Sequence, residues 1–162
     1  MALKYGKHVV TANKALIAEH VMSIFEEAES RGLLVCYEAA VAGGIPIIKS
    51  VREGLSANRI NWLAGIINGT TNFILSEMDA KGREFSDVLA EAQMKGYAEA
   101  DPTFDVEGID ASHKLAILAS IAFGMPLSLD GLYTDGITKL EPQDVSYAVS
   151  YTHLTLPTSV TV

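Results

Sequence analysis

The chain is acidic: its 162 residues include 20 Asp and Glu against 12 Lys and Arg, a formal net charge of -8. Binding to the phosphates of nucleic acid requires a surplus of Lys and Arg, so this balance argues against that class of protein. Hydrophobic residues make up 49% of the chain and charged residues 20%, which excludes disorder as the main state. A small metabolite or another protein remains as the expected partner.

The sequence also argues against a membrane or secreted protein. The longest nearly unbroken apolar stretch, residues 115–123, is too short to span a bilayer, and no basic-then-apolar signal opens the chain. The one cysteine, Cys36, cannot form an internal disulfide, which favours a reducing, cytoplasmic setting. Cys36 lies in the apolar run LLVCYEAAV, and we predict a small buried side chain there rather than a nucleophile.

The first part of the chain predicts a β-α-β unit. Residues 9–10 end a strand, and Asn13 is a good N-cap for a helix whose apolar residues recur every three or four positions until Gly32. Residues 33–41 form a continuous apolar run that is typical of a buried strand. The crossover implies a largely parallel pair, and because buried parallel strands normally have neighbours on both sides, we expect part of the domain to precede Met1.

The next segment, AGGIPIIKSVREGL, begins with a pair of glycines. Gly43 and Gly44 allow a tight turn, and Pro46 suits the first turn of a short helix that ends at Gly54. Paired glycines also permit carbonyl oxygens to converge on a cation, although they are more often simple turns. From the residues alone both interpretations stay open.

Three further elements are predicted before the acidic stretch. Residues 59–67 form a second strand candidate, closed by the turn signal Asn68-Gly69. Thr70 or Thr71 is expected to cap a helix over residues 71–82, and Ser86 to cap another over 86–96, with Phe85 as a hydrophobic staple.

The acidic stretch is GYAEADPTFDVEGIDASHKL, residues 96–115. Its carboxylates are Glu99, Asp101, Asp105, Glu107 and Asp110, and the apolar run LAILASIAF follows. If a helix starts near residues 106–108, Asp110 and Lys114 are four positions apart and share one face. They form either a surface salt bridge, or a carboxylate that positions an ammonium group for proton exchange with a substrate. The alternative for the whole stretch is a solvated loop whose last acid favours a helix N-terminus.

The end of the chain changes in character. Residues 140–148 look like the start of another helix, with Pro142 near its first turn. From residue 149 on, VSYTHLTLPTSVTV contains no acidic residue, Lys or Arg, and it neither continues the helical pattern nor caps it. An edge strand is one interpretation. We predict instead a domain over 1–148 and a foreign tail over 149–162, such as read-through of a truncated or mis-assembled reading frame.

Four blocks stand in one order over roughly residues 4–148: GKHVVTANKAL, YEAAVAGGIPII, NWLAGIINGTTNFIL and GYAEADPTFDVEGIDASHKLAILA. Together they resemble the catalytic region of homoserine dehydrogenase. The resemblance implies an NAD(P)-dependent oxidoreductase that interconverts L-homoserine and L-aspartate 4-semialdehyde, on the route to threonine, methionine and isoleucine. It also implies a cytoplasmic homodimer and an α/β fold, in which a mixed-sheet substrate domain is appended to a nucleotide-binding Rossmann domain.

The resemblance implies a role for each of several residues. Lys114 is similar to the proton donor and acceptor at the substrate oxygen, and Lys14 to a second active-site lysine that reaches cofactor and substrate. Glu99 and Asp110 resemble carboxylates that hold the substrate's ammonium group, and Asp105 fits the same acidic pocket. The remaining matches are Gly96, where backbone meets NADP or NAD, and a site for Na⁺ or K⁺ made from main-chain carbonyls of Glu38, Val41, Gly43 and Ile45.

The sequence departs from the family pattern at both ends. The Rossmann half, with its glycine-rich phosphate loop, has no counterpart here, and neither do the later strands and helices. We therefore expect a substrate pocket without most of its cofactor site, and an isolated chain that is inactive. Two alternatives remain: a stand-alone homoserine-binding or dimerisation module, and a relative of aspartate-semialdehyde dehydrogenase, whose thiol nucleophile Cys36 is badly placed to supply.

Overall fold

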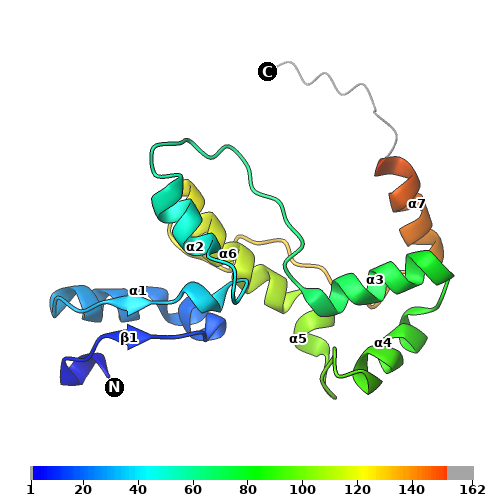
Figure 1. Ribbon diagram of the computed structural model, residues 1–162, viewed down its shortest axis with the longest axis horizontal. Helices are drawn as coiled ribbons and strands as arrows, with labels where there is room; N and C mark the ends of the chain where they lie inside the picture. Colours follow the sequence, from blue (N-terminus) through cyan, green and yellow to red (C-terminus); the bar gives the residue numbers. More distant parts are fainter. Residues whose placement is uncertain (1, 153–162) are drawn as a thin grey trace. The chain divides into compact units, whose positions relative to one another are not determined.

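The structure is a computed structural model that describes residues 2–152, and its chain forms two compact units (Figure 1). Unit 1 consists of Met1–Ile67 and Ile109–Thr134, and unit 2 consists of Asn68–Gly108 and Asp135–Val162. The chain therefore passes between the units three times. Each unit has its own hydrophobic core, and each is described separately below.

Unit 1 contains the predicted β-α-β unit. After the short helix η1 (Leu3–Tyr5), strand β1 (Val9–Val10) leads into helix α1 (Lys14–Ser30), and strand β2 (Val35–Cys36) follows. The strands are parallel, with Val9 opposite Val35, which confirms the α/β fold class. The Asn13 side chain accepts the Leu16 N–H at 3.0 Å, so the predicted N-cap is confirmed.

The prediction of a buried strand over residues 33–41 is wrong for most of that run. Strand β2 covers only Val35–Cys36, and residues Glu38–Ala40 form the short 3₁₀ helix η2. Cys36 is exposed, which contradicts the predicted buried side chain. The reason is the alternation of a strand: Val35 packs against the core of unit 1, so its neighbour Cys36 points to the opposite face, which nothing in unit 1 covers.

The core of unit 1 joins α1 to two later helical segments. Helix α2 (Ile47–Lys49) continues into η3 (Ser50–Gly54), a π-helical turn, and helix α6 (Ile109–Phe123) packs against both α1 and η3. The buried core residues are Ile17, Val41, Ile48, Ile117 and Leu118. Gly124 adopts a φ of +64°, a left-handed conformation that lets the chain leave the end of α6 without strain.

The predicted strand over residues 59–67 is absent from the structure. This segment runs without regular secondary structure between η3 and the next helix, and Trp62 in its middle is 76% exposed. A strand is held by hydrogen bonds to a neighbouring strand, and within residues 2–152 the only ladder joins β1 to β2. Its β-favouring residues therefore have no partner that could hold them in a sheet.

Unit 2 is helical. It contains α3 (Gly69–Lys81), α4 (Phe85–Met94), the single turn α5 (Thr103–Val106) and α7 (Pro142–Thr152). Helices α4, α5 and α7 all pack against α3. The buried core residues are Ile74, Met78, Val88, Ala92, Ala98 and Val106.

The helix starts in unit 2 differ from the predicted ones. Asn68, with extended backbone, is the N-cap of α3 in place of Thr70 or Thr71, and its side chain accepts the Thr71 N–H at 2.8 Å. Glu84 occupies the N-cap position of α4, so Ser86 lies inside the helix. In both cases the helix begins earlier because the residue before it already has the extended backbone that a cap needs.

Helix α7 continues past the predicted domain boundary. It ends at Thr152, so the expectation that residues 149–152 do not continue the helix is wrong. The remainder of the predicted tail, residues 153–162, lies outside the described residues.

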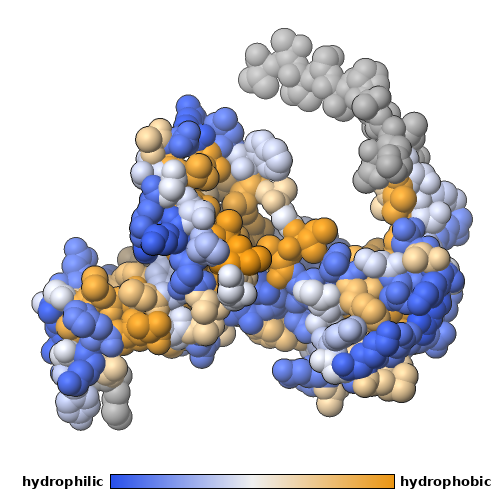
Figure 2. Space-filling model, viewed as in Figure 1, coloured by the Kyte–Doolittle hydropathy of each residue, from blue (hydrophilic) through white to orange (hydrophobic). Residues whose placement is uncertain are grey.

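Both units expose apolar side chains among charged ones, and the face seen in Figure 2 carries several hydrophobic areas. The large exposed hydrophobic residues include Val10, Leu34, Trp62 and Ile66 in unit 1, and Met94 and Tyr97 in unit 2. None of the helices within the described part of the chain combines the length and the apolar character needed to cross a membrane.

Candidate functional site

Two helices of unit 1 bring two lysines to one aspartate. Lys14 is the first residue of α1, directly after the capping residue Asn13. Asp110 and Lys114 lie one turn apart in the first half of α6, so their side chains leave the same face of that helix. The packing of α1 against α6 then brings Lys14 to the same place.

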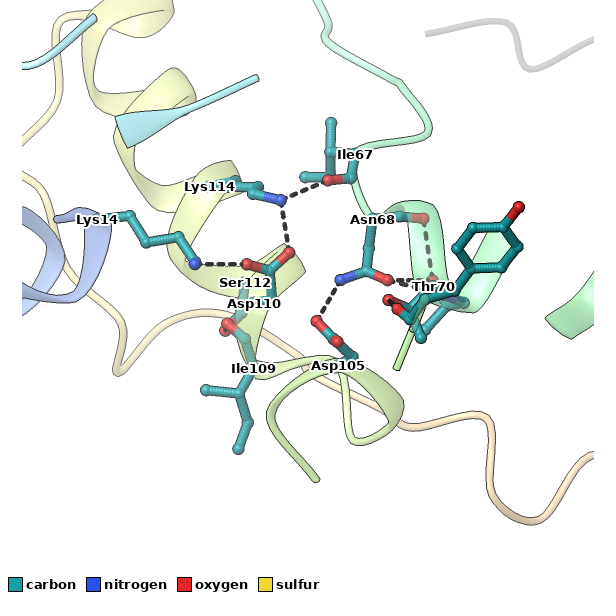
Figure 3. A network of polar contacts seen from close by, with 11 residues as sticks. Lys14, Ile67, Asn68, Thr70, Asp105, Ile109, Asp110, Ser112 and Lys114 are labelled. Atoms are coloured by element: carbon teal, nitrogen blue, oxygen red, sulfur yellow. Dashed lines mark hydrogen bonds and ion pairs between the residues drawn. The ribbon is translucent and has the colours of Figure 1, made fainter. Parts of the chain in front are cut away.

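Asp110 binds both ammonium groups, as Figure 3 shows. Its Oδ2 lies 2.6 Å from the Nζ of Lys114, and its Oδ1 lies 2.8 Å from the Nζ of Lys14. The side chain of Asp110 is only 5% exposed, against 17% for Lys114 and 28% for Lys14. A buried carboxylate is tolerated when cations compensate the loss of water, and here each oxygen has its own cation.

A backbone carbonyl completes the position of Lys114. Its Nζ donates to the carbonyl oxygen of Ile67 at 2.7 Å, in addition to Asp110 (Figure 3). An ammonium group has three donor positions, so these two fixed acceptors also fix the direction of the third. The arrangement can present one N–H, or the lone pair of the neutral amine, to a ligand in a constant direction.

The acidic residues of the stretch before α6 belong to unit 2. Asp105 lies in α5, and its Oδ1 accepts a hydrogen bond of 2.7 Å from the side-chain nitrogen of Asn68 (Figure 3). Glu99 is exposed, and its backbone carbonyl oxygen accepts a hydrogen bond from the side-chain amide of Gln93. Gly96 follows α4 with a φ of +73° and open space on the side where a side chain would stand. A ligand can therefore approach this backbone closely.

The loop proposed to bind a cation, residues 38–45, is held at its first residue by the Glu38 carboxylate. The two oxygens of Glu38 accept the N–H groups of Ile48 and Lys49, each at 2.9 Å, and tie residue 38 to the start of α2. Burial raises the pKa of the adjacent Tyr37; the Arg52 guanidinium opposes this shift and the Glu38 charge adds to it.

The backbone of this loop turns sharply between its ends. Ala42 has a φ of +49° and Gly44 a φ of +85°. Within the described residues the carbonyl oxygens of Val41 and Gly43 accept no hydrogen bond, and no group of three or more His, Cys, Asp or Glu could hold a metal. A cation in this loop would therefore depend on main-chain oxygens.

Sequence reasoning missed two contributors, Ile67 and Asn68. The acceptor of Ile67 is a backbone carbonyl, which no residue type can signal. Asn68 was interpreted as part of an Asn-Gly turn, whereas an Asn that is followed by helix-compatible residues is equally an N-cap signal. That second interpretation would have found it.

Lys14, Asp110 and Lys114 bring a buried carboxylate and two amines within hydrogen-bond distance in an α/β unit, which makes them a candidate site for proton transfer. The sequence model of homoserine dehydrogenase matches residues 46–154. The chain belongs to the homoserine dehydrogenase family, a family of oxidoreductases.

Individual relatives agree with this assignment. The homoserine dehydrogenase of Pseudomonas aeruginosa is 74% identical over 147 residues, which are 91% of this chain and 34% of that protein. The homoserine dehydrogenase of Neisseria gonorrhoeae is 60% identical over 147 residues, again 91% of this chain and 34% of that protein. The chain thus spans about a third of the length of the curated relatives it matches.

Solved structures show the same similarity. The crystal structure of a homoserine dehydrogenase from Thiobacillus denitrificans matches with a TM-score of 0.89 at 64% identity, over 91% of this chain and 34% of that one. A hyperthermophilic archaeal homoserine dehydrogenase in complex with NADPH matches with a TM-score of 0.77 at 33% identity, over 86% of this chain and 43% of that one.

Proposed function

We propose that the chain is the catalytic region of a homoserine dehydrogenase, which interconverts L-homoserine and L-aspartate 4-semialdehyde with NAD(P). The observation that carries the proposal is the cluster of Lys14, Asp110 and Lys114, in which one buried carboxylate binds two lysines. In the reverse direction the aldehyde would be reduced to L-homoserine, which would serve the synthesis of threonine, methionine and isoleucine.

Oxidation of a primary alcohol removes two hydrogens from the substrate as different species. The C–H bond at the alcohol carbon breaks and its electron pair leaves with the hydrogen, while the O–H bond loses a proton and a C=O bond forms. When bound, the oxidised nicotinamide supplies the acceptor for the hydride. The proton is the part that this chain's own residues must handle.

Lys114 would accept that proton at its Nζ. For this step it is the neutral amine, and the Ile67 carbonyl and Asp110 keep its third position directed at the hydroxyl oxygen. The ammonium that forms is stabilised at once by the Asp110 carboxylate 2.6 Å away. In the reverse direction the same group would return the proton to the aldehyde oxygen.

The carboxylates have two separate tasks. Both oxygens of Asp110 are engaged by lysines, so we assign it mainly the orientation of Lys14 and Lys114, with any contact to the substrate's ammonium group secondary. Glu99 and Asp105 would bind that ammonium group, because acidic side chains complement the cationic end of an amino acid.

Lys14 and Gly96 are the residues of this chain that would reach the dinucleotide. Lys14 is partly exposed, and Gly96 offers open backbone, so both fit this task. In the loop of unit 1, the main-chain carbonyls of Glu38, Val41, Gly43 and Ile45 would hold Na⁺ or K⁺. The carbonyl oxygens of Val41 and Gly43, which accept no hydrogen bond from the described residues, support this role.

We further propose a cytoplasmic homodimer, a domain over residues 1–148 and a foreign segment over 149–162. The isolated chain is expected to bind L-homoserine and to be inactive, because it spans about a third of its relatives' length and most of the dinucleotide site is expected in the family's Rossmann half.

The first experiment is calorimetric titration of L-homoserine, and then of NADPH, into the chain in potassium- or sodium-containing buffer. Binding of homoserine without NADPH is the expected result. Replacing either Glu99 by Gln or Asp105 by Asn should weaken it. Absence of homoserine binding by a chain that still melts cooperatively would contradict the proposal for the isolated chain.

A second experiment tests Lys114 by turnover. The chain replaces the matching third of the Pseudomonas aeruginosa relative, and Lys114→Ala is compared with Lys81→Ala. Both lysines form an ion pair four positions along a helix, but Lys81 is exposed and has no proposed role. Lys114→Ala should lower kcat by about 10²–10⁴ with homoserine binding retained. An unchanged kcat would refute the proton-transfer role, and binding without turnover in the unsubstituted chimera would favour a binding module.

A further inference from the structure

Asn68 is one of three polar residues that are buried within the described part of the chain, at 8% exposure. A buried amide must satisfy its hydrogen-bonding groups within the protein. The environment of Asn68 in unit 2 shows where its two ends are directed.

The oxygen end of the amide is occupied by α3. Oδ1 accepts the backbone N–H of Thr71 at 2.8 Å and the Thr71 hydroxyl at 3.0 Å. The backbone N–H is only a donor, so the Asn68 oxygen must face it, and the orientation of the amide is determined.

The nitrogen end is consequently directed at Asp105. Its Nδ2 donates to Oδ1 of Asp105 at 2.7 Å, a contact between residues 37 positions apart (Figure 3). The other oxygen of Asp105 accepts no hydrogen bond from the described residues. One fixed oxygen and one available oxygen make a carboxylate that is already oriented before a cation arrives.

We propose that Asn68 is a positioning residue for substrate recognition: it caps α3 with its amide oxygen and, with its amide nitrogen, holds Asp105 in the orientation that receives the ammonium group of the amino-acid substrate. This inference rests on the proposed function, because it gives Asp105 the substrate's ammonium group as its ligand. It adds a residue that is placed to act on the substrate through Asp105.

The two tasks of Asn68 can be separated by substitution. Serine is a good N-cap, so Asn68→Ser keeps an acceptor for the Thr71 N–H but is too short to reach Asp105. Asn68→Asp also keeps the cap and places a second carboxylate against the first. Asn13→Ser is the matched control, because Asn13 caps α1 in the same way through the Leu16 N–H.

The test measures L-homoserine affinity by calorimetry and stability by thermal melting, on the 162-residue chain. Asn68→Ser should lower the affinity about tenfold, the loss of one hydrogen bond to a charged group, and Asn68→Asp should lower it further. Asn13→Ser should leave both the affinity and the melting temperature nearly unchanged, because serine also caps α1. In an Asp105→Asn background, Asn68→Ser should have no further effect on affinity.

A second readout does not depend on the ligand. In the ligand-free chain the side-chain NH₂ protons of Asn68 should exchange slowly with solvent, and Asp105→Ala should make them exchange faster.

Each other outcome overturns the inference in a recognisable way. If homoserine binds and Asn68→Ser binds it equally well, or if the loss persists in the Asp105→Asn background, Asn68 is only a helix cap. If the NH₂ protons are unprotected, the contact itself is absent. If the unsubstituted chain does not bind homoserine, the proposed function of the isolated chain fails, and the positioning role fails with it.

Discussion

The burial of Asp110 between two lysines predicts a large loss of folding stability when its charge is removed. In Asp110→Ala, the ammonium groups of Lys14 and Lys114 lose their shared counterion, and Lys114 remains largely shielded from water. Breaking a buried ion pair by removing one partner costs about 3–5 kcal/mol. Because Lys14 is partly exposed and can rehydrate, we expect about 3 kcal/mol for the alanine variant and about 2 kcal/mol for Asp110→Asn, which still accepts hydrogen bonds.

The measurement is urea unfolding followed by far-ultraviolet circular dichroism, with the free energy extrapolated linearly to water. Glu77→Ala is the matched control, because Glu77 also lies between two cations, Lys81 and Arg83, but its side chain is 21% exposed, against 5% for Asp110. Surface pairs contribute about 0.2–1 kcal/mol, so the control should lose less than about 1 kcal/mol.

Two results would refute this reasoning. A loss below about 1 kcal/mol for Asp110→Ala would mean that the cluster is as well solvated as a surface pair. A double variant with Lys14→Met whose loss equals the sum of the two single losses would mean that Lys14 and Asp110 do not interact.

Three further predictions concern unit 2 and the end of the chain. Gly136→Ala should destabilise unit 2 by about 1–3 kcal/mol in the same urea assay, because its Cβ would lie 2.7 Å from the Val106 carbonyl oxygen; a neutral effect would contradict this close approach. The hydrogen bond from Lys95 lowers the pKa of Glu91 to about 2, so the ion pair stabilises the folded state fully above about pH 4.5 and the effect disappears as the pH falls towards 2. The difference in melting temperature between wild type and Glu91→Gln should follow that course, and a difference independent of pH would be inconsistent with it. Deleting residues 149–162 should change the melting temperature by less than about 2 °C, because Val145, which packs against the core of unit 2, precedes residue 149; a larger fall would show that the segment belongs to the fold.

Local features of the chain were predictable. Helix α1, the glycine that follows it, and helix α6 could be predicted from sequence, because a helix is held by hydrogen bonds between residues four positions apart. For the same reason the Asp110–Lys114 pair could be predicted from spacing alone. The four sequence blocks that resemble homoserine dehydrogenase could also be identified without a structure, and the comparisons with known proteins confirm that family.

Contacts between distant residues were decided by the tertiary structure. Nothing near Lys14 in sequence indicates that its ammonium group binds Asp110, since that contact depends on how α1 packs against α6. The hydrogen bond from Asn68 to Asp105 is of the same kind. Residues 59–67 favour β structure but form no strand, because a strand exists only where another strand is present to pair with it. Sequence therefore determined the candidate site residues and the helices that present them. Tertiary packing determined which of these residues touch, because side-chain contacts across the fold depend on partners that no local pattern encodes.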